Sequence, residues 1–136
     1  MRGVLVDTGP IVALLDRSDA EHDQVISALA SLRDPLLTVW PVVVEAMYLL
    51  SFSWRAQKGL WEMLETGAVE LLPLDQTDVP RMKQLMEKYR DQPMDLADAA
   101  LVCVAEREGL RRILTLDRTD FTVYRVARRG RFTLLP

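Results

Sequence analysis

Four acidic side chains lie in surroundings that are otherwise apolar. Asp7 follows three apolar residues, Glu45 interrupts an apolar stretch, Asp98 lies among alanines and valines, and Asp117 follows a run of mainly apolar residues. An ionised carboxylate removed from water is costly unless a cation pairs with it or a metal ion binds it. The residues three and four positions away from Glu45 include no cation, so no local helix pair neutralises it. These acids are the first candidates for chemistry.

The chain offers a metal ion oxygen ligands rather than nitrogen or sulfur ligands. Its one histidine, His22, lies in a polar segment, where we expect an exposed helix position. Its one cysteine, Cys103, has no partner for an internal disulfide, in agreement with a reducing compartment. Carboxylates favour Mg²⁺ or Mn²⁺ over zinc. Such ions lower the pKa of bound water and stabilise charge on a reacting phosphate, so the acids indicate phosphodiester hydrolysis.

Several of the acids also fit ordinary structural roles. Asp7 suits a helix cap or a turn. Asp95 suits the N-cap of a helix in which Asp98 is a capping-box-like partner, although Asp98 lies deeper in the apolar segment. Asp117 and Asp120 suit turns. We expect Asp98 to face the site, and Asp95 to support it or to cap the helix.

The elements that position these acids predict an α/β fold with a largely parallel sheet. Short apolar runs predict strands at 4–6, 36–38, 69–72 and 113–115, with weaker candidates at 123–126 and 132–135. Apolar periodicity and breaker residues predict helices at 9–15, 19–32, 41–52, 58–65, 77–89 and 95–108, with Thr77 as one cap. Ligands bind at the carboxyl edge of such a sheet, where Asp7 and Asp117 follow their strands.

Length and composition indicate one soluble domain. The chain has 136 residues, of which 49% are hydrophobic and 27% charged, as in an average globular domain. No signal-like start and no bilayer-spanning apolar stretch is evident, so we expect a cytoplasmic protein. The net charge of −3 combines −5 over residues 1–94 with +2 over residues 95–136. The cationic run of Arg125, Arg128, Arg129 and Arg131 either contacts phosphates or forms a solvated edge.

An ordered set of short motifs resembles the PIN-domain family, including its VapC-type toxins. The motifs are Leu5-Val6-Asp7-Thr8-Gly9-Pro10, Val44-Glu45, Asp95-Leu96-Ala97-Asp98-Ala99 and Thr115-Leu116-Asp117-Arg118-Thr119-Asp120-Phe121. They follow the family's order and extend over essentially the whole chain. The resemblance implies a single PIN-like domain over residues 1–136, with a three-layer α/β/α fold around a mainly parallel sheet. It also implies an acidic pocket that binds one or two Mg²⁺ or Mn²⁺ ions.

The same resemblance implies roles for individual residues. The catalytic and metal-binding acids are Asp7, Glu45, Asp98 and Asp117. Asp120 is a substitute for the fourth acid, Thr8 and Thr115 are hydroxyl groups beside the acids, and Asp95 is an extra supporting acid. The implied reaction is metal-dependent endonucleolytic hydrolysis of single-stranded RNA, with weak RNA contacts from Arg118, Arg125, Arg128 and Arg129.

The resemblance also implies partners. PIN toxins are commonly homodimers and are silenced by a small antitoxin that covers an apolar groove. Trp54, Trp61 and Met63 are candidates for that surface, with ordinary packing as the alternative.

Three other interpretations compete with a ribonuclease. A DNA nuclease or an rRNA-processing enzyme would share the fold, but the chain lacks the extra domains or arch insertion that a structure-specific DNA nuclease carries. A non-catalytic RNA- or protein-binding module would not need all four acids. A response-receiver domain would need a lysine after the strand at 113–115, and the sequence has none there.

Overall fold

A five-stranded parallel sheet forms the centre of the protein. The structure is a computed structural model that describes residues 2–127 and 130–136. The strands run in the order β3-β2-β1-β4-β7, and every neighbouring pair is parallel. Their bounds are Val4–Val6 for β1, Leu36–Thr38 for β2, Val69–Leu71 for β3, Arg112–Leu114 for β4 and Thr133–Leu135 for β7. Leu5 of β1 pairs with Leu37 of β2 on one side and with Ile113 of β4 on the other.

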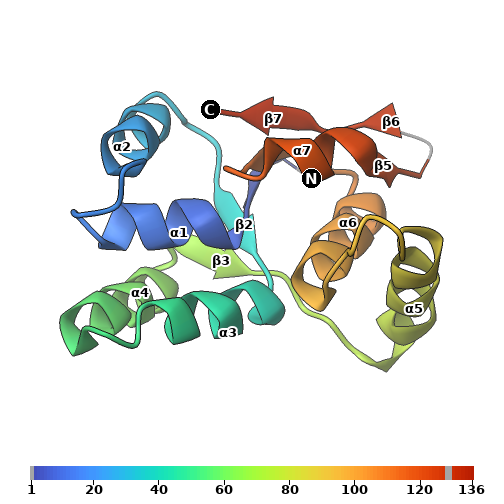
Figure 1. Cartoon of the computed structure of the whole chain (residues 1–136), viewed down its shortest axis with the longest axis horizontal. Coiled ribbons are helices and arrows are strands. Elements are labelled where there is room, and N and C mark those ends of the chain that lie inside the picture. Colours follow the sequence, from blue (N-terminus) through green and yellow to red (C-terminus); the bar gives the residue numbers. More distant parts are fainter. Residues whose placement is uncertain (1, 128–129) are drawn as a thin grey trace.

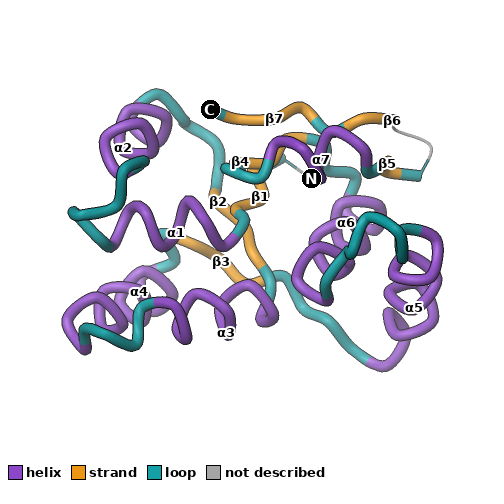
Figure 2. Tube along the Cα trace, in the orientation of Figure 1, coloured by secondary structure: helices purple, strands orange, loops and turns teal. Residues whose placement is uncertain are grey.

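Helices cover both faces of this sheet. On one side lie α1 (Thr8–Leu15), α2 (His22–Ala30), α3 (Trp40–Leu49) and α4 (Trp54–Thr66). On the other side lie α5 (Val79–Lys88), which follows the 3₁₀ turn η1 (Gln76–Asp78), and α6 (Leu96–Glu108), as Figures 1 and 2 show. The described C-terminal part adds α7 (Arg118–Val123) and an antiparallel hairpin of β5 (Arg125–Val126) and β6 (Gly130–Arg131). The fold is therefore the expected three-layer α/β/α arrangement.

Burial explains why the short apolar runs form strands. All three residues of β1 are buried, because helices cover both faces of the parallel sheet. Helix α6 is buried from Ala97 to Ala105, and its hydrophobic residues surround the helix instead of forming one stripe. Asp98 lies within this buried segment, so α6 carries a carboxylate into the interior.

The strand order places two strand ends together at the carboxyl edge of the sheet. The chain proceeds outward from β1 to β2 and β3, and then crosses over so that β4 pairs with the opposite side of β1. The amide of Asp7 donates to the carbonyl of Leu114 across this junction, at 3.0 Å. The order of strands reverses here, and α/β proteins bind ligands at such a point.

Several predicted boundaries were wrong, each for a local reason. Helix α4 begins at Trp54 instead of residue 58, because the Ser53 hydroxyl caps it by accepting from the amide of Ala56. Thr77 is not a cap, since Asp75 caps the 3₁₀ turn by accepting from the amide of Thr77.

The larger errors concern the segment after β4. Residues 118–123 form helix α7, although Asp120 was expected in a loop, and the strand expected at 123–126 is reduced to Arg125–Val126. Asp117 begins this helix as its N-cap.

Among the described residues, none of the helices combines the length and the apolar character that a membrane span requires.

Candidate functional site

Asp7 lies at the end of β1 and is held from two sides. Its Oδ1 accepts from the amide of Thr8 at 2.8 Å, so that Asp7 is also the N-cap of α1. Its Oδ2 accepts from the hydroxyl of Thr115 at 2.9 Å, and the same hydroxyl oxygen accepts from the amide of Asp117 at 2.9 Å. The two interpretations of Asp7, helix cap and site acid, are therefore compatible. Thr115 couples the ends of β1 and β4.

Asp98 projects from the first turn of α6. Asp95 is the N-cap of this helix and accepts from the amide of Asp98 at 2.8 Å, which confirms the capping role considered for Asp95. The Oδ2 atom of Asp98 accepts from the hydroxyl of Tyr124 at 2.8 Å. Only 8% of Asp98 is exposed. One oxygen of Asp98 is thus fixed by the tyrosine.

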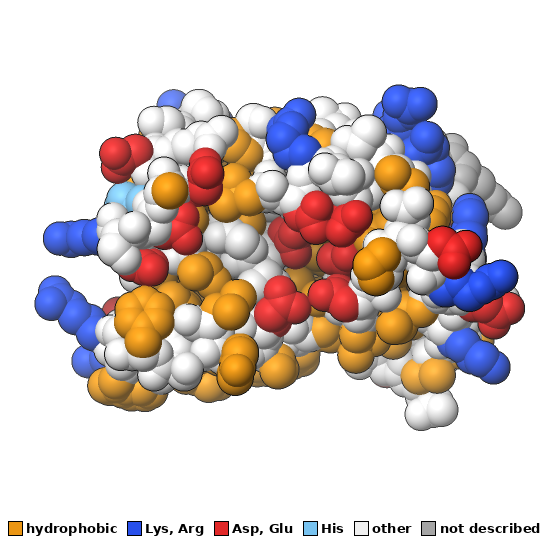
Figure 3. Space-filling model, viewed as in Figure 1, with side chains coloured by type: hydrophobic (Ala, Val, Ile, Leu, Met, Phe, Trp, Pro, Cys, Tyr) orange, Lys and Arg blue, Asp and Glu red, His pale blue; other side chains and the backbone are white. Residues whose placement is uncertain are grey.

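Asp117 and Asp120 complete a compact group of carboxylates. One oxygen each from Asp98, Asp117 and Asp120 lies within 4.8 Å of the others. Asp117 caps α7 by accepting from the amide of Asp120. Figure 3 shows acidic side chains gathered at the centre of this face. The structure therefore brings Asp120, expected only as a supporting residue, within 4.8 Å of Asp98, together with Asp117.

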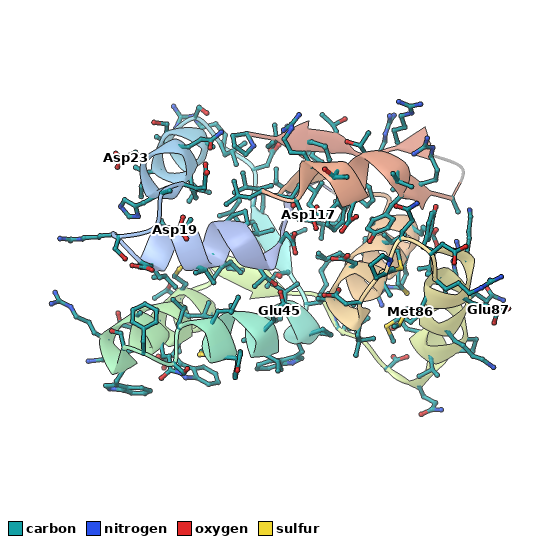
Figure 4. All side chains as sticks on the ribbon, viewed as in Figure 1. Asp19, Asp23, Glu45, Met86, Glu87 and Asp117 are labelled. Atoms are coloured by element: carbon teal, nitrogen blue, oxygen red, sulfur yellow. The ribbon has the colours of Figure 1, made fainter. Side chains whose placement is uncertain are left out.

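Glu45 approaches the acids from α3 and lies close enough to Asp7 to raise the pKa of that acid. Figure 4 shows Glu45 and Asp117 near the middle of the same face. The hydroxyl oxygen of Thr8 is buried and makes no hydrogen bond of ordinary geometry within the described part of the chain, although it lies close enough to Glu45 to lower the pKa of that acid. A nearby cation or bound water would satisfy this oxygen.

The electrostatics of the acids reflect burial without compensation by cations. Burial raises the pKa of Asp7 to about 6, and Asp117 and Glu45 add repulsion. Burial likewise raises the pKa of Asp98 to about 8, against the hydrogen bond from Tyr124. Burial and the charge of Asp95 raise the pKa of Glu45. Among the described residues, none of the ion pairs involves these acids.

The residues present fit a divalent cation bound by oxygen. The donors are carboxylates and the buried hydroxyl of Thr8 beside Glu45, and hard ions prefer such oxygen ligands. A cation would also offset the burial penalty, and the smaller repulsion between the acids, that raise the pKa values of Asp7 and Asp98.

The predicted RNA-contacting arginines lie in different environments. Arg118 is exposed next to Asp117, and one of its guanidinium nitrogens donates to the carbonyl of Pro136. Arg125 donates to the carbonyls of residues 122–124, so its guanidinium is engaged with the end of α7. Arg128 and Arg129 lie outside the described residues.

Other sequence-based expectations are partly corrected. His22 is half-buried instead of exposed, and its Nδ1 lies 2.6 Å from the carbonyl oxygen of Ala13, which ties α2 to α1. Trp54 and Trp61 are exposed, whereas Met63 is half-buried.

Sequence reasoning missed Tyr124. This side chain is fully buried, packs edge-on against Tyr89 and Phe121, and donates to Asp98. The two partners lie 26 positions apart, so no local spacing could have paired them. A tyrosine inside an apolar tail segment was the only available signal.

Comparison with known proteins defines the class of protein. The chain matches the PIN domain family over residues 4–128. It therefore belongs to the PIN domain family, as the motifs suggested. It is 33% identical over 135 residues to Ribonuclease VapC26 of Mycobacterium tuberculosis, an alignment that covers 98% of this chain and 100% of the relative.

Solved structures share the fold at lower sequence identity. The M. tuberculosis VapC20 structure, described as a sarcin-ricin loop cleaving toxin, has a TM-score of 0.79 and 18% identity, over 86% of this chain and 92% of that chain. VapBC2 of Rickettsia felis, bound to a DNA fragment from its promoter, has a TM-score of 0.70 and 14% identity, over 99% and 100% of the two chains. FitAcB of Neisseria gonorrhoeae has a TM-score of 0.65 and 20% identity, over 87% and 90%.

Proposed function

We propose that the protein is a metal-dependent endoribonuclease that cleaves single-stranded RNA. The observation that carries the proposal is a group of acids that pair with no cation of the described residues, at the point where the strand order reverses. The similarity to a VapC ribonuclease over nearly the whole chain supports the same activity. Carboxylates that lack a cationic partner and face a ligand-binding edge are suited to divalent ions.

In this proposal Asp7, Glu45, Asp98 and Asp117 hold one or two Mg²⁺ or Mn²⁺ ions, and Asp120 joins them. When bound, such an ion supplies an activated water and neutralises charge on the phosphate. The hydroxyl of Thr115 donates to Asp7 at the end of β4 and so fixes the orientation of the Asp7 carboxylate. Tyr124 fixes one oxygen of Asp98 and leaves the other for the ion. Arg118 is exposed at the rim and attracts the RNA backbone.

The proposal extends to the biological setting. The protein acts as the toxin of a toxin–antitoxin pair in the cytoplasm, forms a homodimer, and is a single PIN domain over residues 1–136. Structures of similar fold come from a toxin–antitoxin complex of Klebsiella pneumoniae and from VapBC2. Trp54 and Trp61 of α4 are 66% and 42% exposed, as expected of side chains that an antitoxin covers.

Cleavage of a generic single-stranded RNA tests this proposal. Wild type, Asp98→Asn and Asp75→Asn are compared in Mn²⁺, Mg²⁺ or EDTA. Asp75 is a matched control, because it is the exposed N-cap of the 3₁₀ turn η1 and asparagine is an equally good N-cap residue. We expect cleavage by wild type and Asp75→Asn only with metal, and none by Asp98→Asn. Failure of wild type both to cleave RNA and to bind Mn²⁺ would overturn the proposal.

A further inference from the structure

We propose that the depression between the starts of α3 and α6 binds an unpaired RNA base, with the indole of Trp40 as its stacking surface. This inference rests on the proposed ribonuclease function and adds a base-recognition subsite beside the acids. The depression measures about 440 Å³, within the range of small-molecule pockets, and its walls include Trp40, Val44, Glu45, Asp95 and Leu96.

The apolar part of this depression lies open to solvent. Trp40, Val44 and Leu96 are 48%, 65% and 50% exposed, although all three are large hydrophobic residues. Trp40 and Val44 lie one turn apart on α3, and Leu96 is the first residue of α6. A contiguous exposed patch of this kind marks a binding surface.

The charges of the walls favour a base over a phosphate. The described walls carry two carboxylates, Glu45 and Asp95, and no lysine or arginine. A phosphate would be repelled, whereas the flat face of a base stacks on an indole irrespective of its sequence. Proteins recognise single-stranded RNA by such stacking and by hydrogen bonds to base edges.

The depression is continuous with the proposed active site. Glu45 forms part of its wall and also lies close enough to Asp7 to raise the pKa of that acid. Asp95 caps the helix that carries Asp98. A base on Trp40 therefore lies one side chain away from the acids that would hold the scissile phosphate through metal.

Asp95 gives the subsite a preference among bases. Its Oδ1 accepts from the amide of Asp98, and its carboxylate lies within hydrogen-bonding reach of Glu45, so the two acids together form the polar part of the wall. Cytosine, adenine and guanine present exocyclic amino donors, whereas uracil presents carbonyl oxygens in their place. We expect amino-bearing bases to bind in preference to uracil.

Removal of the indole tests the stacking surface. Affinity for a short single-stranded RNA is measured with Ca²⁺ in place of Mn²⁺, and KM and kcat are measured with Mn²⁺. We expect Trp40→Ala to weaken binding by about 5- to 100-fold, the range for loss of one base–aromatic stack. KM should rise while kcat and Mn²⁺ affinity stay unchanged. Trp40→Phe should restore most of the affinity, and Trp54→Ala, an exposed tryptophan of α4, should change nothing.

An unchanged RNA affinity in Trp40→Ala would overturn the inference. If that variant instead changed the sedimentation mass and kept its RNA affinity, a second copy of the chain would be the occupant, and the base subsite would be wrong.

A fluorescence measurement separates this inference from the proposed activity. The chain contains three tryptophans, so Trp54→Phe combined with Trp61→Phe leaves Trp40 as the only indole. We expect single-stranded RNA to quench its emission, with oligocytidylate or oligoadenylate stronger than oligouridylate. Asp95→Asn, which keeps the helix cap but adds amide donors, should reduce that difference. Quenching without RNA cleavage would reject the ribonuclease alone, whereas cleavage without quenching would reject the base subsite alone.

Discussion

Acids that are buried or half-buried lie near both ends of helix α6, and the two ends differ in whether an arginine pairs with them. Near the C-terminal end, Asp78 accepts from Arg107 at 2.9 Å, and Glu106 accepts two hydrogen bonds from Arg81 at 2.8 and 2.7 Å. Burial opposes ionisation of Glu106, yet the hydrogen bonds from Arg81 and from the amide of Ala127 lower its pKa.

At the N-terminal end, no arginine of the described residues pairs with the acids. Among those residues the side chain that donates to Asp98 is Tyr124, and burial together with the charges of Asp95 and Asp7 raises the pKa of Asp98 to about 8. The two ends of α6 therefore differ. Near the C-terminal end the acids pair with arginine side chains, and near the N-terminal end they are free to bind a cation from solution. An arginine offsets part of the cost of burying an acid, whereas an acid without such a partner keeps oxygen ligands free at the cost of stability.

The sharpest way to break this contrast is to neutralise Asp98. Asp98→Asn should lower RNA cleavage by at least about 100-fold, beyond the loss expected for an outer-shell partner. The same change should raise the free energy of unfolding of the metal-free protein at pH 8 by about 1–3 kcal/mol, because it removes an unpaired buried charge. Urea unfolding in EDTA measures this gain. A lower free energy of unfolding in Asp98→Asn would mean that the charge of Asp98 is already stabilised in the folded protein. It would contradict the difference between the two ends of α6.

The pH dependence of stability should reveal the same unpaired acids. In the folded metal-free protein, the pKa values of Asp7 and Asp98 are raised from 3.8 to about 6 and about 8. The folded state therefore holds protons that the unfolded chain has lost, and stability should fall as pH rises from about 4 to about 8. Each group contributes at most about 1.4 kcal/mol per pH unit. Urea unfolding across this range checks the slope, and saturating Mn²⁺ should flatten it.

At the other end of α6, removal of the cation should cost stability and spare activity. Arg107→Met leaves Asp78 buried without its partner, so we expect a loss of about 1–3 kcal/mol in the free energy of unfolding, with RNA cleavage per folded molecule retained. Lys58→Met serves as the control, because Lys58 and Glu62 are exposed and 4.0 Å apart. Such pairs contribute about 0.5 kcal/mol or less. If Arg107→Met and Lys58→Met lowered the free energy of unfolding equally, the buried pair would contribute no more than the exposed pair.

The smallest expected effect concerns the positioning of Asp98 by Tyr124. Tyr124→Phe should weaken Mn²⁺ binding and cleavage by about 10-fold, because outer-shell hydrogen bonds orient metal ligands. Tyr89→Phe is the matched control: it is also a buried tyrosine, but its hydroxyl accepts from the amide of Arg125. Calorimetric Mn²⁺ titration separates a hydroxyl that positions Asp98 from a hydroxyl that only stabilises the fold. A merely structural hydroxyl would lower stability in both variants and leave Mn²⁺ affinity unchanged in both.

Local sequence was sufficient to predict most of the sheet and the buried positions of two acids, Asp7 and Asp98. The apolar runs at 4–6, 36–38 and 69–72 had to become strands, because only buried parallel strands accommodate such short runs between helices. Asp7 and Asp98 were identifiable because each interrupts or ends an apolar segment, and the interior around them follows directly from that pattern.

Local sequence was insufficient where the outcome depends on partners distant in the chain. The pattern after β4 gave no helix, because α7 is only six residues long and is stabilised by its Asp117 cap and by burial of Phe121. Arg125 looked like a free cation, but its guanidinium contacts the carbonyls that end α7. The pairing of Asp78 with Arg107 spans 29 positions and was equally invisible.

The sequence by itself therefore determined that Asp7 and Asp98 would enter the interior, since hydrophobic burial of their neighbours carries them there, whereas Asp117 is exposed and the buried Asp78 gave no such signal. Only the tertiary structure decided which acids would meet a cation. The crossover to β4 places Asp117 and Asp120 beside Asp98, and α5 places its arginine beside Glu106. The physical reason is that electrostatic pairing acts over a few ångströms in space, whereas a sequence pattern reports only neighbours along the chain.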